Sequence, residues 1–236
     1  MAEAAASGPT ARTVQNAPVV DLSGMRSREE AAGLTLVNVA LVLVPEDIPD
    51  LLRGASCTNV AAIIPVPAGT RVESRIGQME LSGQALAAGD SAALLCLIGQ
   101  VVVTAPVPAV GYRGLILVGQ ILLPRSAQEH VAARILHEIG QVTYYDDDAK
   151  PWVFHGNTRL TAGFLDLLEE PRTLILMDQS TFAADVTPQL LRGKASGLVL
   201  LGDATVEEET LLPMVQYLAK TSLGSIRLAG AGEPGA

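Results

Sequence analysis

The stretch Leu95-Cys96-Leu97-Ile98-Gly99-Gln100-Val101 returns in similar form as Leu115-Ile116-Leu117-Val118-Gly119-Gln120-Ile121. Its centre belongs to a wider repeat of an amide followed by an apolar residue: Asn38-Val39, Asn59-Val60, Gln78-Met79, Gln100-Val101, Gln120-Ile121 and Gln141-Val142. Successive amides lie 21, 19, 22, 20 and 21 positions apart. A fixed period in this range is typical of solenoid proteins. The repeat predicts an α/β solenoid of stacked parallel strands with coils of about 21 residues.

The recurring amide has a physical explanation in such a stack. Identical amides in successive coils can hydrogen-bond to one another, or to turn backbone one layer away, so that no polar group is left buried and unpaired. The last four copies are preceded by Gly77, Gly99, Gly119 and Gly140. Glycine permits the tight or left-handed backbone that a coil corner requires.

The chain divides by pattern into a leader, one solenoid domain and a tail. Residues 1–20, rich in Ala, Ser, Gly and Pro, are predicted to be a disordered leader, and residues 230–236 a flexible tail. Within the single domain 21–229, we expect regular coils, mostly β, over 21–145, an interrupting loop over 146–158, and longer helix-plus-strand repeats over 159–229. Helical spacing predicts helices at 126–139, 160–170, 188–193 and 207–220.

Several units place paired leucines shortly before the amide, as in Leu95 and Leu97 before Gln100, and Leu115 and Leu117 before Gln120. This spacing resembles the leucine-rich-repeat family, whose consensus has an Asn a few residues after paired leucines on a concave parallel strand. The resemblance covers about half of the chain and implies architecture alone. Gln replaces Asn in four of the six copies. A plain parallel β-solenoid is therefore the competing interpretation.

Composition limits the classes of partner. Of the 236 residues, 49% are hydrophobic and 17% charged, and the formal net charge is −9. An acidic chain without a basic patch is not expected to bind nucleic acid or anionic membranes, and no apolar run reaches the length of a membrane-spanning helix. Cys57 and Cys96 fall two coils apart in the repeat, about 10 Å, which is too far for a disulfide. We expect two reduced, buried thiols and a cytoplasmic protein.

No motif for catalysis, cofactors or metals stands out. The sequence has no Gly-rich phosphate loop, nucleophile elbow or zinc spacing, so no cofactor or metal is predicted. His130 and His137, with Arg134 between them, are interpreted as a solvated face of the predicted 126–139 helix. The triplet Asp146–Asp148 lacks the spacing of a calcium loop and is interpreted as a solvated turn.

The one local anomaly is a cluster of aromatic residues. Of eight aromatic residues, Tyr144, Tyr145, Trp152 and Phe154 lie within eleven positions, next to His155. We interpret them chiefly as a hydrophobic plug where two modes of stacking meet. The alternative is an interaction patch formed by these five residues, because aromatic side chains concentrate binding energy at interfaces.

The expected function is non-catalytic: a structural or protein-interaction solenoid that self-associates as a homo-oligomer. Its association edge is predicted at the last strand, around Ser225, Ile226 and Leu228, because an uncapped edge of a solenoid invites pairing. The alternative is a hydrolase-like enzyme, or a binder of carbohydrate or peptide, that uses the loop from Asp146 to His155.

Overall fold

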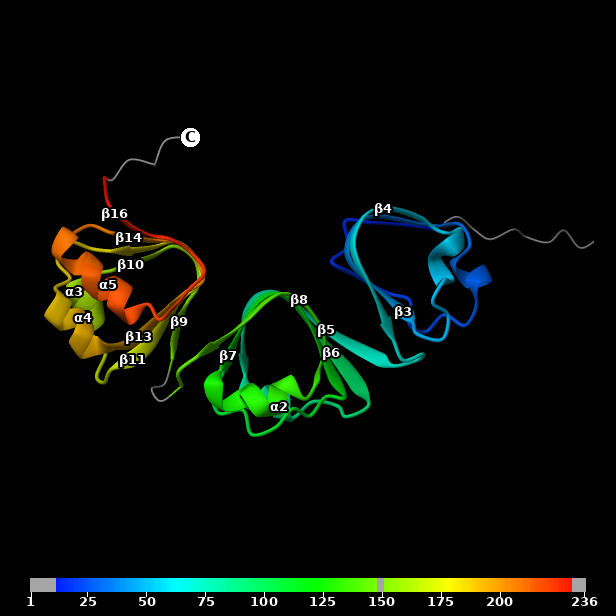
Figure 1. Ribbon diagram of the computed structural model, residues 1–236, viewed down its shortest axis with the longest axis horizontal. Coiled ribbons are helices and arrows are strands. Elements are labelled where there is room, and N and C mark those ends of the chain that lie inside the picture. The colour runs from blue at the N-terminus through cyan, green and yellow to red at the C-terminus, as the bar shows by residue number, and fades with distance from the viewer. Residues whose placement is uncertain (1–11, 148–150, 231–236) are drawn as a thin grey trace, which may run out of the picture.

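The computed structural model describes residues 12–147 and 151–230. Parallel strands dominate it and are arranged as three stacks that lie side by side (Figure 1). We call residues 12–66 stack 1, residues 71–145 stack 2 and residues 152–228 stack 3. In each stack, every strand after the first layer pairs with a strand one turn earlier in the chain. The helices are few and short, and in Figure 1 those of stack 3 cover one side of its strands.

Stack 1 is built around one long central strand. Its elements are β1 (Arg12–Gln15), β2 (Val19–Asp21), β3 (Leu34–Pro45) and β4 (Ser56–Val66), with 3₁₀ turns η1 (Arg28–Ala31) and η2 (Leu51–Gly54). β1 and β2 both pair with one side of β3, and β4 pairs with the other. The stack therefore has three layers. The β-branched and leucine residues of β3 are almost all buried, as expected for a strand with a neighbour on both sides.

Stack 2 has four layers in nearly unbroken register. Its elements are β5 (Arg71–Ser82), α1 (Gly83–Ala87), β6 (Ala93–Thr104), β7 (Gly114–Pro124), η3 (Arg125–Ala127), α2 (Gln128–Ala132) and β8 (Ile135–Tyr145). The register aligns Gly77, Gly99, Gly119 and Gly140, and likewise the four glutamines that follow them. The repeat of about 21 residues in the sequence is therefore a repeat of layers. The inner strands β6 and β7 are the most buried.

Stack 3 also has four layers, but each layer contributes one strand to each of two sheets. The first sheet holds β9 (Trp152–Phe154), β11 (Arg172–Leu176), β13 (Ala195–Leu200) and β15 (Thr221–Ser222). The second holds β10 (Thr158–Leu160), β12 (Ser180–Phe182), β14 (Ala204–Val206) and β16 (Ile226–Leu228). The return segments are α3 (Ala162–Asp166), α4 (Pro188–Lys194), and η4 (Glu209–Leu211) with α5 (Leu212–Leu218). Thr161 and Thr187 cap α3 and α4 through their side-chain oxygens.

The segments between stacks return to the first layer. After β4, Gly69 N donates to Ser23 O at 2.9 Å, and Ser23 is the second residue after the end of β2. β5 therefore starts beside the first layer of stack 1. In stacks 2 and 3, Glu80 of β5 and Trp152 of β9 line one groove, and β8 contacts β15. All three stacks thus run in the same direction. We call the side with β1, β2, β5, β9 and β10 the start face, and the side with β4, β8, β15 and β16 the end face.

Apolar side chains hold the stacks together. One buried cluster joins Leu41 and Leu43 of β3 to Leu94 and Cys96 of β6, and a second joins Tyr145 of β8 to strands of stack 3. Each stack also has its own interior cluster. In the part of the chain that the structure describes, no helix is long and apolar enough to span a membrane.

Four expectations from the sequence need correction. The segment 126–139 is not one helix, because α2 ends at Ala132 and Ile135 begins β8. The spacing of the apolar residues Val131, Ile135 and Ile139 fits both the helical period of about 3.6 residues and the strand period of about 2. Residues 12–15 and 19–21, assigned to a disordered leader, form β1 and β2, while residues 1–11 lie outside the described residues.

Cys57 is exposed on the edge strand β4, although Cys96 is buried and both are free. The coils of 21–145 do not form one ladder, because β4 and β5 belong to different sheets.

Candidate functional site

An asparagine ladder runs along the corner of stack 1. Asn59 Nδ2 donates to Asn38 Oδ1, and Asn38 Nδ2 donates to Asn16 Oδ1, both at 2.9 Å. All three residues have φ between 53° and 54°, a left-handed conformation that Asn tolerates better than most residues. The asparagine therefore makes the corner and bonds the layers. Sequence reasoning missed Asn16, although its spacing of 22 from Asn38 fits the repeat.

A glutamine ladder runs along the corner of stack 2. Gln78 Nε2 donates to Gln100 Oε1 at 2.8 Å, and Gln100 Nε2 donates to Gln120 Oε1 at 2.7 Å. Here the preceding glycine adopts the corner conformation, with φ between 108° and 119° in all four layers. A Cβ on Gly99 would collide with the Gly77 carbonyl oxygen, and Gly119 meets Gly99 in the same way. The hydrogen bonding of amides between layers, expected from the sequence, is present in both stacks.

Stack 3 uses carboxylates at its corner. Asp203 Oδ1 accepts from both Ser225 N and Ser225 Oγ at 2.8 Å, and Arg227 donates to Asp203 Oδ2. These hydrogen bonds from Ser225, with help from the Arg227 charge, lower the pKa of Asp203. One layer earlier in the sequence, Asp178 Oδ2 accepts from Gly156 N at 2.7 Å and from Gln78 Nε2 at 2.8 Å. The corners of stacks 2 and 3 are therefore joined.

The five residues of the predicted interaction patch do not share one surface. Tyr145 is buried, and its hydroxyl donates to Val103 O at 3.0 Å. Trp152 and Phe154 are half-buried and pack with Phe164, with ring centroids 5.4 to 5.7 Å apart. This trio packs against the interior cluster of stack 3 at its first layer. Of the other two, Tyr144 is half-buried and His155 is exposed.

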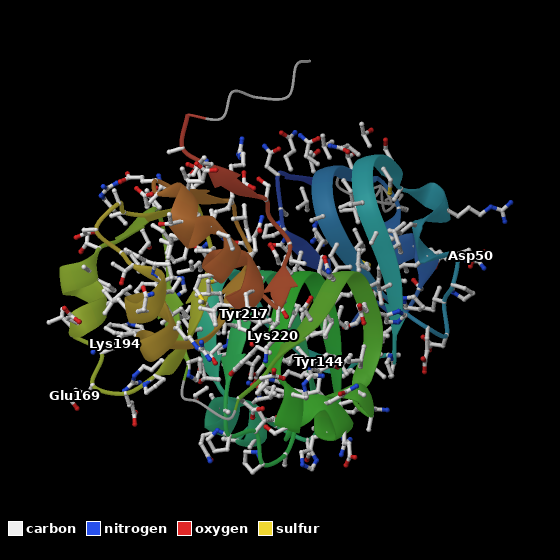
Figure 2. All side chains as sticks on the ribbon, turned by 60° about the vertical axis from the view of Figure 1, so that its left-hand side comes forward. Asp50, Tyr144, Glu169, Lys194, Tyr217 and Lys220 are labelled. Atoms are coloured by element: carbon white, nitrogen blue, oxygen red, sulfur yellow. The ribbon has the colours of Figure 1, made fainter. Side chains whose placement is uncertain are left out.

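The loop proposed for hydrolase chemistry starts where stacks 2 and 3 meet. Asp146 accepts from Arg125 and forms an ion pair with Lys220; the bond from Arg125 is the main cause that lowers the pKa of Asp146. Tyr144 and Lys220 line a pocket of ≈ 180 Å³ here (Figure 2), below the usual range of about 300–1,000 Å³ for ligand sites. His155 follows β9 in the first layer, and no hydrogen bond joins it to Asp146 or Asp147. Asp148 lies outside the described residues.

The predicted association edge belongs to a larger set of open strands. β16, with Ile226 and Leu228 half-buried, pairs only with β14 among the described strands, and the Ser225 side chain is bound to Asp203. The longer terminal strands β4, β5 and β8, each of 11 or 12 residues, are more exposed. Sequence reasoning missed them because it placed them inside one continuous ladder.

The exposed apolar side chains gather at the ends of the stacks. Among the described residues, the large hydrophobic side chains that are exposed all lie in terminal strands or next to or within the first or last helix of a stack: Ile63, Ile76, Leu136, Ile139, Leu167 and Tyr217. Tyr217 is seen on α5 in Figure 2. We therefore take the two ends of the stacks as candidate interaction surfaces. The candidate functional site is thus the pair of end surfaces, the start face and the end face.

No group of three or more His, Cys, Asp or Glu side chains in the described ranges could hold a metal ion. No protein-family model, curated protein or solved structure matches this chain. The resemblance to leucine-rich repeats therefore depends on the spacing of the leucines alone.

Proposed function

We propose that this chain is a non-catalytic structural protein, a parallel β-solenoid in three stacks that forms homo-oligomers through the exposed ends of its stacks. It would act as a scaffold built from copies of itself. The proposal is supported by the open strand edges, which present unpaired backbone N–H and C=O groups to any strand that can continue the stack. Amide ladders along the stacks add to this tendency, as they do in other stacked β assemblies.

The observation that carries the proposal is one column of aliphatic residues in stack 2. The register aligns Ile76, Ile98, Val118 and Ile139 across the four layers. Ile98, an inner member, is 8% exposed and belongs to the buried cluster that joins stacks 1 and 2. Val118 is half-buried, and the two end members Ile76 and Ile139 are 47% and 39% exposed. Among the described strands, β5 and β8 each have a neighbour in this stack on one side only, so a further layer at either end would cover the open side of Ile76 or Ile139.

The stacks favour a β-solenoid over a leucine-rich repeat. In stack 2, 11- to 12-residue strands pass through the glycine corner without interruption, and the helices between them have at most five residues. Corner amides that bond layer to layer are also a feature of stacked β coils. A helix in every repeat occurs only in stack 3.

The proposal is tested by measuring the mass in solution by light scattering over a wide range of concentration. We expect the mass to rise with concentration or to be that of a fixed oligomer. Ile226→Pro tests the edge predicted from the sequence. Ser225 O and Ala229 N bond to residues of the β14 segment, and alternate residues of a parallel strand bond to the same neighbour. The Ile226 N–H therefore points to the open side, and proline there should weaken association without unfolding the chain. A strict monomer at every concentration would refute self-association.

A further inference from the structure

We infer that copies of this chain assemble head to tail, with the end face of one copy on the start face of the next, so that stacks 2 and 3 continue across the junction and form an open-ended filament. This inference rests on the proposed self-association and adds its geometry. Three features of the two faces support it: the columns of stack 2, the direction of its amide ladder and the charges at its two ends.

The columns of stack 2 match when β8 of one copy meets β5 of the next. In the register of the stack, Ile139 is aligned with Ile76, Gly140 with Gly77 and Gln141 with Gln78. A junction that keeps this register would place each of these residues beside its own kind. It would cover the exposed Ile76 and Ile139 side chains with each other, on the side of stack 2 where Ile98 joins the cluster with stack 1.

The glutamine ladder has a direction, and that direction favours one order of copies. The amide nitrogens of the first two glutamines donate toward the end face, from Gln78 to Gln100 and from Gln100 to Gln120. At the start face, the Gln78 amide nitrogen is used by Gln100 and Asp178, and Gln78 Oε1 accepts no bond from the described residues. Gln141 on the end face can supply the donor for Gln78 Oε1 of the next copy.

Opposite charges stand at the two ends of one column. Arg75 of β5 and Glu138 of β8 are both exposed and align with Leu97 and Leu117 of the inner strands. A head-to-tail junction brings Glu138 against Arg75 of the neighbour. Two start faces, or two end faces, related by a two-fold axis would pair β5 or β8 antiparallel with itself. Such a contact gives up the aligned columns and the pairing of Glu138 with Arg75, so the symmetric alternatives are disfavoured.

Stack 3 is compatible with the same junction. Its register would place Ile226 beside Thr158 and Leu228 beside Leu160 of the next copy. Arg227 and Arg159 would also meet, but each is already paired within its own copy, to Asp203 and Glu207 respectively. Stack 1, with three layers, would leave space for one layer at each junction.

A head-to-tail contact uses two different surfaces and does not close on itself when copies follow one another along the stack axis. Four layers at about 4.8 Å each give a rise of about 19 Å per copy. Electron micrographs of concentrated protein should therefore show filaments with this axial repeat.

The register is tested by disulfide trapping in a Cys57→Ser background. Within one copy Gln78 and Gln141 are three layers apart, about 14 Å, beyond the reach of a disulfide, whereas across the junction they are neighbours at about 4.8 Å. Gln78→Cys/Gln141→Cys should give a ladder of covalent oligomers on a non-reducing gel under mild oxidation, and each single variant should not. If the wild-type mass rises with concentration but the double variant stays uncrosslinked, self-association stands and this geometry is wrong.

The polarity is tested by charge reversal and mixing. Arg75→Glu alone opposes two glutamates at the junction, and Glu138→Arg alone opposes two arginines, so each should lower the weight-average mass toward that of a monomer. An equimolar mixture restores opposite charges at every junction and should assemble again.

The matched controls are Arg192→Glu, on the exposed side of α4, and Glu46→Arg, just after β3. Circular dichroism checks folding of each variant. Single variants that are folded and assemble like the wild type, or a mixture that stays monomeric, would overturn the head-to-tail order.

Discussion

Gln78 Nε2 donates a hydrogen bond to Asp178 Oδ2 at 2.8 Å, although the two residues are 100 positions apart in the chain. The same carboxylate oxygen accepts from Gly156 N. One aspartate therefore ties the corner of stack 2 to the corner of stack 3 and also holds the first turn of stack 3.

Replacing Asp178 with Ala removes two charge-assisted hydrogen bonds at the junction of stacks 2 and 3. We expect the free energy of unfolding to fall by about 1–2 kcal/mol, because bonds to a charged acceptor contribute somewhat more than neutral ones and this site is partly exposed. Urea denaturation measures the change. Asp47→Ala, an exposed aspartate with no side-chain hydrogen bond or ion pair among the described residues, is the control and should have little effect. Equal values for the two variants would contradict a role for Asp178 in joining the stacks.

A methyl group at Gly99 should be among the most destabilising small changes in the chain. The added Cβ would collide with the Gly77 carbonyl oxygen, and Gly99 has φ +117°, a region that L residues rarely adopt. We expect Gly99→Ala to cost about 3 kcal/mol or more, since strain and collision act together. Gly163→Ala is the matched control: it lies in α3 with nothing within 4 Å of the added atom, and Ala in a helix should be neutral or stabilise by up to about 1 kcal/mol.

The aromatic trio predicts that Trp152 contributes to stability. Trp152 is half-buried, stacks on Phe154 and packs against Phe164 with the rings tilted. Truncation to Ala should lower the free energy of unfolding by about 2–3 kcal/mol, less than the 3–5 kcal/mol expected of a fully buried aromatic residue. Tyr217→Ala, at a residue that is 74% exposed, should change monomer stability by less than about 0.5 kcal/mol. A neutral Trp152→Ala would instead favour an interaction patch.

Alkaline pH should destabilise the fold through Tyr145. Burial raises its pKa far above the ordinary value for tyrosine. A raised folded-state pKa means that the unfolded chain releases its proton first, so the stabilisation is complete below about pH 10 and is lost as pH rises above it. The loss approaches about 1.4 kcal/mol per pH unit for one such group. Burial also raises the pKa of Cys96 to about 12. The unfolded chain therefore releases this proton first as well, which adds a further loss of folding stability that begins near pH 9.

Thermal denaturation between pH 8 and pH 11 checks this expectation. Tyr145→Phe loses the bond to Val103 O, so it should be less stable at neutral pH by about 1 kcal/mol. Its stability should also fall less steeply above pH 10. The same slope in both proteins would show that Tyr145 does not cause the alkaline loss.

The repeat alone predicted parallel stacked strands, the layer spacing and the amide bonds between layers. These features are local in character: a corner needs Gly or Asn every 20 or so residues, and a strand needs β-branched and aliphatic residues between corners. Asn38 and Gln100 could be assigned to corners because every layer needs a corner residue at the same place as the layer before it. The helix predicted at 126–139 was wrong for the same reason, since apolar spacing over a short segment fits two periods.

Only the tertiary structure decided how the chain divides into three stacks and what lies at their ends. The break between β4 and β5 depends on a four-residue connection, 67–70, that returns to Ser23, and nothing in its composition fixes that return. The start face and the end face follow from this folding back. Arg75 and Glu138 are ordinary strand residues in the sequence, and they become the two ends of one column only because four strands stack in register. Stacking is a long-range arrangement, set by which apolar surfaces meet, and the sequence pattern of a single layer does not contain it.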